Sequence, residues 1–215
     1  AALVVLLAAL ALRLRWNMSN RRIWAANPRG GGAKRTVLVT GAASGLGRCV
    51  AMRAAARGDL VVALDVDAAG LADLTSEASC APVATIVAVC CDVSNPTDVA
   101  RAVETVRTKL GGRTIDVVAN FAGLIRGGPL LELDDCELER VMAVNVLGTQ
   151  RVTKAFIPLM HTEEPRDAES RVPSPKIIVV ASELSYANFS AGFSAPYSMS
   201  KFALEAYALC LLRRT

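Results

Sequence analysis

Downstream of residue 35, short runs of consecutive apolar residues alternate with longer stretches of helical periodicity. The apolar runs predict strands at 36–40, 60–65, 83–89, 114–120 and 176–181. The periodic stretches predict helices at 45–57, 67–79, 95–110, 134–160 and from 196 onward. Strands that are apolar at nearly every position, each followed by a helix, are typical of a parallel sheet covered on both faces. We therefore expect an α/β domain with a doubly wound parallel sheet over residues 36–215.

The N-terminal segment has a different pattern, because residues 1–12 are apolar without interruption and a basic stretch follows. Residues 1–58 carry ten basic and no acidic side chains. As a helix, residues 1–12 would span about 18 Å of a hydrocarbon core of roughly 30 Å. We expect residues 1–25 to be a membrane anchor, with the following domain on the cytosolic side of the endoplasmic reticulum. A signal-peptide core and a buried helix are the alternatives. Residues 26–35 are expected to form a linker.

Composition narrows the functional classes. The chain has 215 residues, of which 53% are hydrophobic, and this excludes a disordered protein. Six cysteines without a C-x-x-C pair argue against a disulfide scaffold, and we expect Cys90 and Cys91 to be free, buried thiols. The single histidine, His161, lies in a charged, proline-rich stretch, so no histidine-based metal site or Ser-His-Asp triad is expected. The net charge of +4 is concentrated near the N-terminus, which argues against a nucleic-acid partner.

A glycine-rich turn follows the first expected strand and opens the first expected helix. Residues 40–47 read Thr-Gly-Ala-Ala-Ser-Gly-Leu-Gly. Glycines at this spacing let the backbone turn tightly and approach a pyrophosphate, whose charge is met by the N–H groups at the start of the helix. Between a strand and a helix, the triplet is much stronger evidence than it is alone. The residues expected to bind a dinucleotide here are Gly41, Ser44, Gly45, Leu46 and Gly47.

Asp65 ends the second expected strand, 24 residues after Gly41. A carboxylate at this position can accept hydrogen bonds from the adenosine ribose hydroxyls, and it would repel a 2′-phosphate. No basic residue precedes Gly45, where Ser44 stands, and we expect the nearby Arg48 to face outward on its helix. The sequence thus predicts NAD rather than NADP as the cofactor.

Two further motifs follow the third and fourth expected strands, namely Cys91-Asp92-Val93 and Asn120-Phe121-Ala122-Gly123. With the glycine turn they resemble the compact members of the short-chain dehydrogenase/reductase family over roughly residues 36–215. Phe121 stands where that family has a second asparagine. The resemblance implies a Rossmann-type fold. It also implies cofactor contacts from Asp92, Val93, Asn120, Ala122 and Gly123.

Tyr197 and Lys201 are four residues apart, on one face of a helix that Pro196 is suited to open. A cation one turn away favours the phenolate, so Tyr197 can act as general acid for carbonyl reduction or general base for alcohol oxidation. The resemblance implies that Lys201 also binds the nicotinamide ribose. The alternative is an ordinary surface pair, with Lys201 engaged by Glu205.

Ser182 follows the fifth expected strand, at the end of the sheet where ligands bind. The resemblance implies a catalytic serine that polarises the substrate oxygen, and Ser182 is the candidate, with Ser185 as the alternative. Asn145 falls within the apolar stripe of the expected helix 134–160. A buried amide costs about 1–3 kcal/mol when unpaired, so Asn145 should have hydrogen-bond partners. The resemblance adds a role for Asn145 in holding a water that connects Lys201 to solvent.

These features predict an NAD-dependent alcohol dehydrogenase or carbonyl reductase. The anchor and a likeness to the retinol/steroid/hydroxybutyrate branch favour a lipophilic substrate, such as a steroid, retinoid or lipid alcohol. A small 3-hydroxy acid and a non-catalytic NAD-binding scaffold are the alternatives. The resemblance also implies further strands after Thr215 and a homodimer or tetramer formed by helices 134–160 and 196–213.

Overall fold

The computed structural model describes residues 35–79, 84–126, 132–160, 175–182 and 195–212. The expected anchor, most of the linker, His161 and Ser185 lie outside these ranges. Within them, five strands form one parallel sheet in the order β3-β2-β1-β4-β5. The strands are β1 (Thr36–Thr40), β2 (Leu60–Asp65), β3 (Thr85–Cys90), β4 (Val117–Asn120) and β5 (Lys176–Val179). The predicted parallel α/β sheet is thus confirmed.

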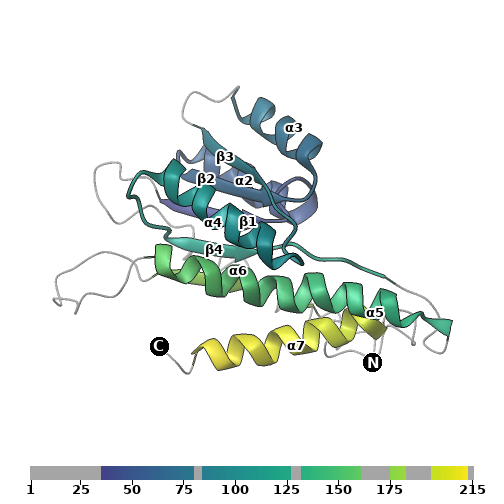
Figure 1. Ribbon diagram of the computed structural model, residues 1–215. Coiled ribbons are helices and arrows are strands. Elements are labelled where there is room, and N and C mark those ends of the chain that lie inside the picture. Colours follow the sequence, from purple (N-terminus) through teal and green to yellow (C-terminus); the bar gives the residue numbers. More distant parts are fainter. Residues whose placement is uncertain (1–34, 80–83, 127–131, 161–174, 183–194, 213–215) are drawn as a thin grey trace, which may run out of the picture. The chain divides into compact units, whose positions relative to one another are not determined.

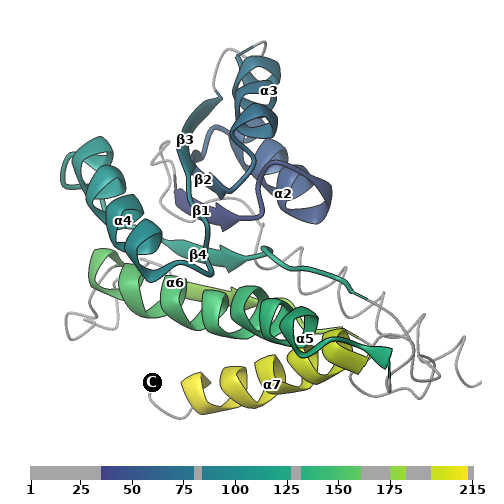
Figure 2. The ribbon, with the colours of Figure 1, turned by 45° about the vertical axis from the view of Figure 1, so that its right-hand side comes forward.

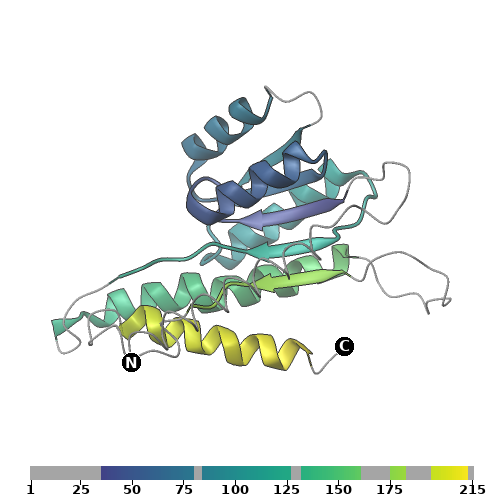
Figure 3. The ribbon, with the colours of Figure 1, turned by 180° about the vertical axis from the view of Figure 1, so that it is seen from behind.

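Helices cover both faces of the sheet, which makes it doubly wound (Figures 1 and 3). One face carries α2 (Gly45–Ala56) and α3 (Ala68–Ala78). The other carries α4 (Pro96–Leu110), α5 (Asp135–Met142), η2 (Ala143–Gly148), α6 (Thr149–Phe156) and η3 (Ile157–Leu159). The last helix, α7 (Ala195–Leu212), runs alongside α5 and α6 (Figure 2). Among the described residues, no helix is both long enough and apolar enough to cross a membrane.

Local sequence explains where these elements begin and end. Strand β1 is buried at every position, as expected of a central strand between two helical layers. Asp67 caps α3 by accepting a hydrogen bond from the Gly70 N–H, and Asn95 caps α4 by accepting one from the Thr97 N–H. Helix α4 ends at Gly111, whose left-handed φ of 54° favours glycine. The core therefore lies on both sides of a central strand, with capped helices closing it.

Two expectations from the sequence need correction. The helix expected over 134–160 is interrupted by the π-helical segment η2, where the backbone widens around Asn145. Cys90 is exposed, at the end of β3, which is an outer strand of the described sheet. Both cysteines are free, as expected, and only Cys91 is buried. Burial raises the pKa of the Cys91 thiol to about 12, so that this cysteine stays protonated.

Candidate active site

The site lies at the carboxyl ends of the strands, where the chain order reverses between β1 and β4. The turn after β1 and the loop after β4 are in close contact here. A Cβ added to Gly41 would lie 2.8 Å from the backbone nitrogen of Ala122. The Thr40 hydroxyl accepts hydrogen bonds from the N–H groups of Phe121 and Ala122, at 3.1 and 3.0 Å. These bonds hold the loop by its backbone, so the Phe121 side chain is not needed for them.

The glycine turn leaves the start of α2 open. Gly41 and Gly45 have φ values of 66° and 54°, and a Cβ added to Gly45 would meet nothing within 4 Å. A Cβ on Gly47 would collide with the Gly41 carbonyl oxygen. Ser44 makes no side-chain cap hydrogen bond, and the first turn of α2 holds no acidic residue. Unlike α3 and α4, α2 thus keeps its terminal N–H groups for an anion.

Asp65 lies beside this turn and is fixed by both carboxylate oxygens. Its Oδ2 accepts a hydrogen bond from the Ala43 N–H, and its Oδ1 accepts one from the Asp67 N–H, both at 2.9 Å. Each oxygen keeps a second lone pair, so the carboxylate can still accept bonds from two ribose hydroxyls. Leu46, in the first turn of α2, is 69% exposed. The arrangement is a cradle with a fixed acidic group at one side.

Arg48 does not face outward as expected, because its side chain lies between α2 and α3. The guanidinium donates to the carbonyl oxygens of Ala43 and Gly70, at 3.5 and 3.3 Å. It also forms an ion pair with Glu77, with an Nη2 to Oε2 distance of 2.6 Å. Arg48 is therefore already occupied by α3.

The remaining residues of the expected cofactor site are placed in different ways. Asp92 is half-buried, and its Oδ1 accepts bonds from both the N–H and the hydroxyl of Ser94, at 2.8 and 2.7 Å. The Val93 side chain is buried against Gly148, in the core. Asn120 is also buried, and its amide nitrogen donates to the Thr153 hydroxyl and the Ile178 carbonyl oxygen, at 3.2 and 3.3 Å. The side chains of Val93 and Asn120 thus support the site from beneath.

Asn145 joins the loop after β4 to helix α7. Its side chain is fully buried, and its Oδ1 accepts a hydrogen bond from the Leu124 N–H at 2.7 Å. Its Nδ2 donates to the Leu124 carbonyl oxygen at 3.0 Å and to the Ser200 hydroxyl at 2.9 Å. The expectation that Asn145 is buried and paired is confirmed. A Cβ on Gly123 would lie 3.4 Å from Asn145 Oδ1, so glycine allows the loop to approach this closely.

Helix α7 carries Tyr197 and Lys201 one turn apart. The Lys201 Nζ lies 5.4 Å from the centroid of the Tyr197 ring and donates to the Val180 carbonyl oxygen at 2.8 Å. Lys201 is 5% exposed, and burial lowers the pKa of its ammonium group below the usual lysine value. Ser182 lies just beyond β5, at the same edge of the sheet, and is half-buried. The structure therefore brings the phenol, the ammonium group and the strand ends to one place.

Ser200 is a part of this arrangement to which the sequence analysis assigned no role. Its hydroxyl donates to the Tyr197 carbonyl oxygen at 2.6 Å while accepting from Asn145, and the side chain is fully buried. A serine between Tyr197 and Lys201, in the helix that the sequence predicts, was the available signal.

Removing the Ser200 hydroxyl should loosen α7. We expect Ser200→Ala to lower the free energy of unfolding by about 1–2 kcal/mol, since the Asn145 amide loses one of its two acceptors. Ser198→Ala is the matched control, because the buried Ser198 hydroxyl has no hydrogen-bond partner among the described residues. Urea unfolding of both variants measures this, and equal losses of stability would contradict the assigned link.

Comparison with known proteins identifies the family of this chain. The family model described as short chain dehydrogenase matches residues 35–214. The chain belongs to the short-chain dehydrogenase family. A solved short-chain dehydrogenase/reductase from Burkholderia phymatum, in complex with NAD, aligns with a TM-score of 0.73 and 26% identity, covering 85% of this chain and 60% of that one. The family resemblance predicted from the motifs is thus confirmed.

Three curated relatives show where the likeness lies. Short-chain dehydrogenase/reductase family 16C member 6 of Bos taurus is 37% identical over 58% of this chain. The NADPH-dependent pterin aldehyde reductase of Arabidopsis thaliana and the 17-beta-hydroxysteroid dehydrogenase 13 of Rattus norvegicus are each 32% identical over 80% of it. The chain spans 39%, 66% and 52% of the lengths of these three relatives. The steroid dehydrogenase confirms the expected likeness to that branch.

Proposed function

We propose that this protein is an oxidoreductase that interconverts an alcohol and its carbonyl with a nicotinamide dinucleotide, using Tyr197 as general acid and base. One observation carries the proposal. Lys201 Nζ lies 5.4 Å from the centre of the Tyr197 ring, at the sheet edge that also carries the open glycine turn. Burial of an ammonium group costs free energy, and a hydrogen bond to the Val180 carbonyl oxygen does not by itself account for a lysine at this place. Its position beside the phenol therefore supports a functional role.

The chain's own groups fit a dinucleotide. The uncapped first turn of α2 suits the diphosphate, and Asp65 suits the adenosine ribose. We favour NAD over NADP, because Asp65 would repel a 2′-phosphate and Arg48 is held by Glu77. One relative is named for NADPH and one similar structure is a complex with NAD, so both cofactors are compared in the test below. When bound, the dinucleotide supplies the hydride donor or acceptor.

Proton transfer falls to side chains of α7. In reduction the Tyr197 hydroxyl would give its proton to the carbonyl oxygen, and in oxidation the phenolate would take the proton of the alcohol. The Lys201 ammonium group stabilises the phenolate by its charge. Ser182 is the candidate for orienting the substrate oxygen, with Ser185 as the alternative. Asn145 fixes the position of α7 through its hydrogen bond to Ser200. It is also proposed to retain the water that links Lys201 to solvent.

We further propose a lipophilic substrate and a site of action at the endoplasmic reticulum membrane, facing the cytosol. The apolar and basic pattern of residues 1–25 and the likeness to the steroid dehydrogenase support this. A homodimer or tetramer is supported by exposed apolar side chains on η2 and α7. These side chains are Leu147, Met199, Phe202 and Leu209.

The experiment that tests the function is a substrate panel. We expect turnover with steroid or retinoid alcohols and carbonyls, and faster turnover with NAD(H) than with NADP(H). The absorbance of NADH and NADPH is followed separately, with short 3-hydroxy acids as the comparison set. Binding of NADH without turnover of any substrate would favour a non-catalytic scaffold. Faster turnover with NADPH would contradict the role given to Asp65.

A further inference from the structure

Arg48 is held close to the proposed adenosine ribose site without facing it. Its guanidinium donates to the Ala43 carbonyl oxygen at 3.5 Å. The Ala43 N–H in turn donates to Asp65 Oδ2 at 2.9 Å. One residue thus separates the guanidinium from the carboxylate that would meet the ribose. The Arg48 side chain is 26% exposed, so this cation is only partly withdrawn from solvent.

The group that holds Arg48 away is Glu77, near the end of α3. The ion pair between them has an Nη2 to Oε2 distance of 2.6 Å, and the Glu77 side chain is 59% exposed. The Gly70 carbonyl oxygen, 3.3 Å from Nη1, is the second contact that turns the guanidinium toward α3. An exposed ion pair of this kind contributes little to stability, so its loss should leave the fold intact.

A guanidinium is also the group best suited to bind a phosphate monoester. Without the Glu77 carboxylate, Arg48 would carry an uncompensated positive charge beside the Ala43 carbonyl oxygen, close to the ribose site where a 2′-phosphate needs a cation. With Glu77 present, the same place holds a neutralised arginine and an additional carboxylate, both unfavourable to a phosphate dianion. The net effect of Glu77 is therefore directed against the phosphorylated cofactor.

We propose that Glu77 determines cofactor specificity in this protein by engaging Arg48 and so denying a 2′-phosphate its only nearby guanidinium among the described residues of α2 and α3. The proposal rests on the proposed function, because it assumes that a dinucleotide ribose lies at Asp65. It adds a residue on the outer helix, remote from the glycine turn in sequence, to the groups that select NAD.

The test compares binding of NADH and NADPH by the protein and its variants, measured by fluorescence titration. Glu77→Gln should lower the ratio of the NADPH to the NADH dissociation constant by about three- to fivefold, the upper part of the range of one exposed ion pair. Asp73→Asn is the matched control, since Asp73 is an exposed carboxylate on the same helix, four residues earlier. It removes the same charge without releasing Arg48, and its ratio should stay within about twofold of the unmodified protein.

The double variant Arg48→Met, Glu77→Gln separates the released cation from the lost carboxylate. We expect it to lose the gain in NADPH binding. Equal changes in Glu77→Gln and Asp73→Asn, a gain that persists in the double variant, or tighter binding of NADPH by the unmodified protein would each overturn the inference. Failure of the proposed function looks different. Either the unmodified protein would bind neither dinucleotide, or it would bind NADH and turn over no substrate, whereas the ratio of the two dissociation constants tests the role of Glu77 alone.

Discussion

Replacing Tyr197 by phenylalanine should lower turnover by about 10²- to 10⁴-fold and leave the affinity for NADH within about twofold of the original. The variant removes the one hydroxyl proposed to move the substrate proton, while the ring beneath Lys201 and the glycine turn stay in place. Initial rates with the best substrate of the panel, together with an NADH titration, measure the two effects separately.

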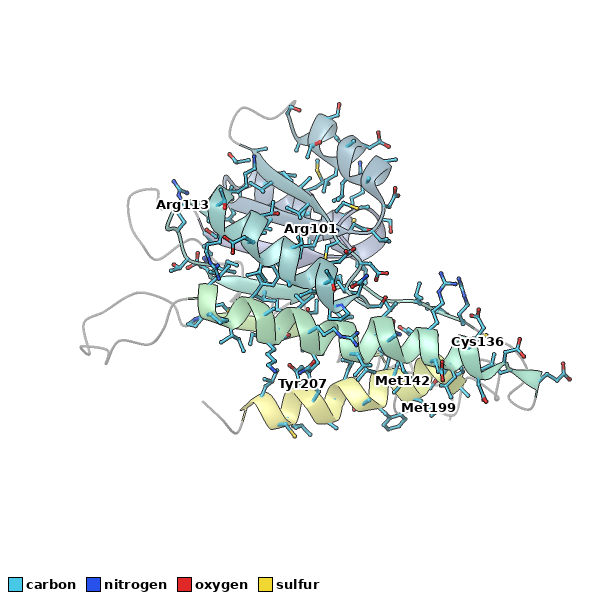
Figure 4. The ribbon with its side chains drawn as sticks, viewed as in Figure 1. Arg101, Arg113, Cys136, Met142, Met199 and Tyr207 are labelled. Atoms are coloured by element: carbon cyan, nitrogen blue, oxygen red, sulfur yellow. The ribbon has the colours of Figure 1, made fainter. Side chains whose placement is uncertain are left out.

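Tyr207→Phe is the matched control, because it also removes a phenol from α7. Figure 4 shows Tyr207 directed from α7 toward α6, and its hydroxyl bonds to Thr153. Burial raises the pKa of this hydroxyl, which therefore stays protonated. We expect Tyr207→Phe to lose about 1 kcal/mol of stability and to keep its turnover within about threefold. A similar loss of turnover in both variants would contradict the role of Tyr197.

The second large effect is expected at Lys201, where activity and stability should change in opposite directions. Lys201→Met should lower turnover by at least about 10²-fold, because the phenolate loses its only proposed stabilising charge. Yet the variant should be more stable than the unmodified protein at neutral pH. Burial of an ammonium group that, among the described residues, donates to one carbonyl oxygen is costly, and a methionine of similar length fills the same space.

The pH dependence of this difference follows from the direction of the pKa shift. Burial lowers the pKa of Lys201 below the ordinary 10.5, so the folded protein binds this proton less tightly than the unfolded chain does. The unmodified protein thus gains stability as pH rises from the lowered pKa to 10.5. The extra free energy of unfolding of Lys201→Met over the unmodified protein should be greatest below this pH range and should decrease across it. Urea unfolding at a series of pH values tests this, and a constant difference would contradict it.

The glycine turn and Asp65 could be predicted from sequence because they depend on local conformation. A left-handed φ at Gly41 and a carboxylate at the end of β2 are properties of one turn and one strand, and the chain pattern reveals both. The orientation of Arg48 could not be predicted in this way. Its side chain is directed by Glu77, which lies 29 residues further on and on another helix.

Asn145 shows which features of a residue the sequence can predict and which depend on how the segments pack. Its burial was predictable from helical periodicity, and so was its need for partners. Which partners it has depends on how η2, the loop after β4 and α7 meet, and the partners come from Leu124 and Ser200. The π-helical widening that admits this contact has no counterpart in the apolar pattern.

By itself, the sequence determined the order of strands and helices along the chain, the glycine-rich turn after β1, and the pairing of Tyr197 with Lys201 one helical turn apart. These follow from residue type and short-range spacing, which fix local backbone conformation and local chemistry. The tertiary structure alone decided that Ser200 ties α7 to Asn145, that Lys201 is bound to Val180, and that Arg48 is engaged by Glu77. Hydrogen bonds and charge pairs between distant segments depend on packing, because a side chain with several possible partners bonds the one that the fold brings within reach.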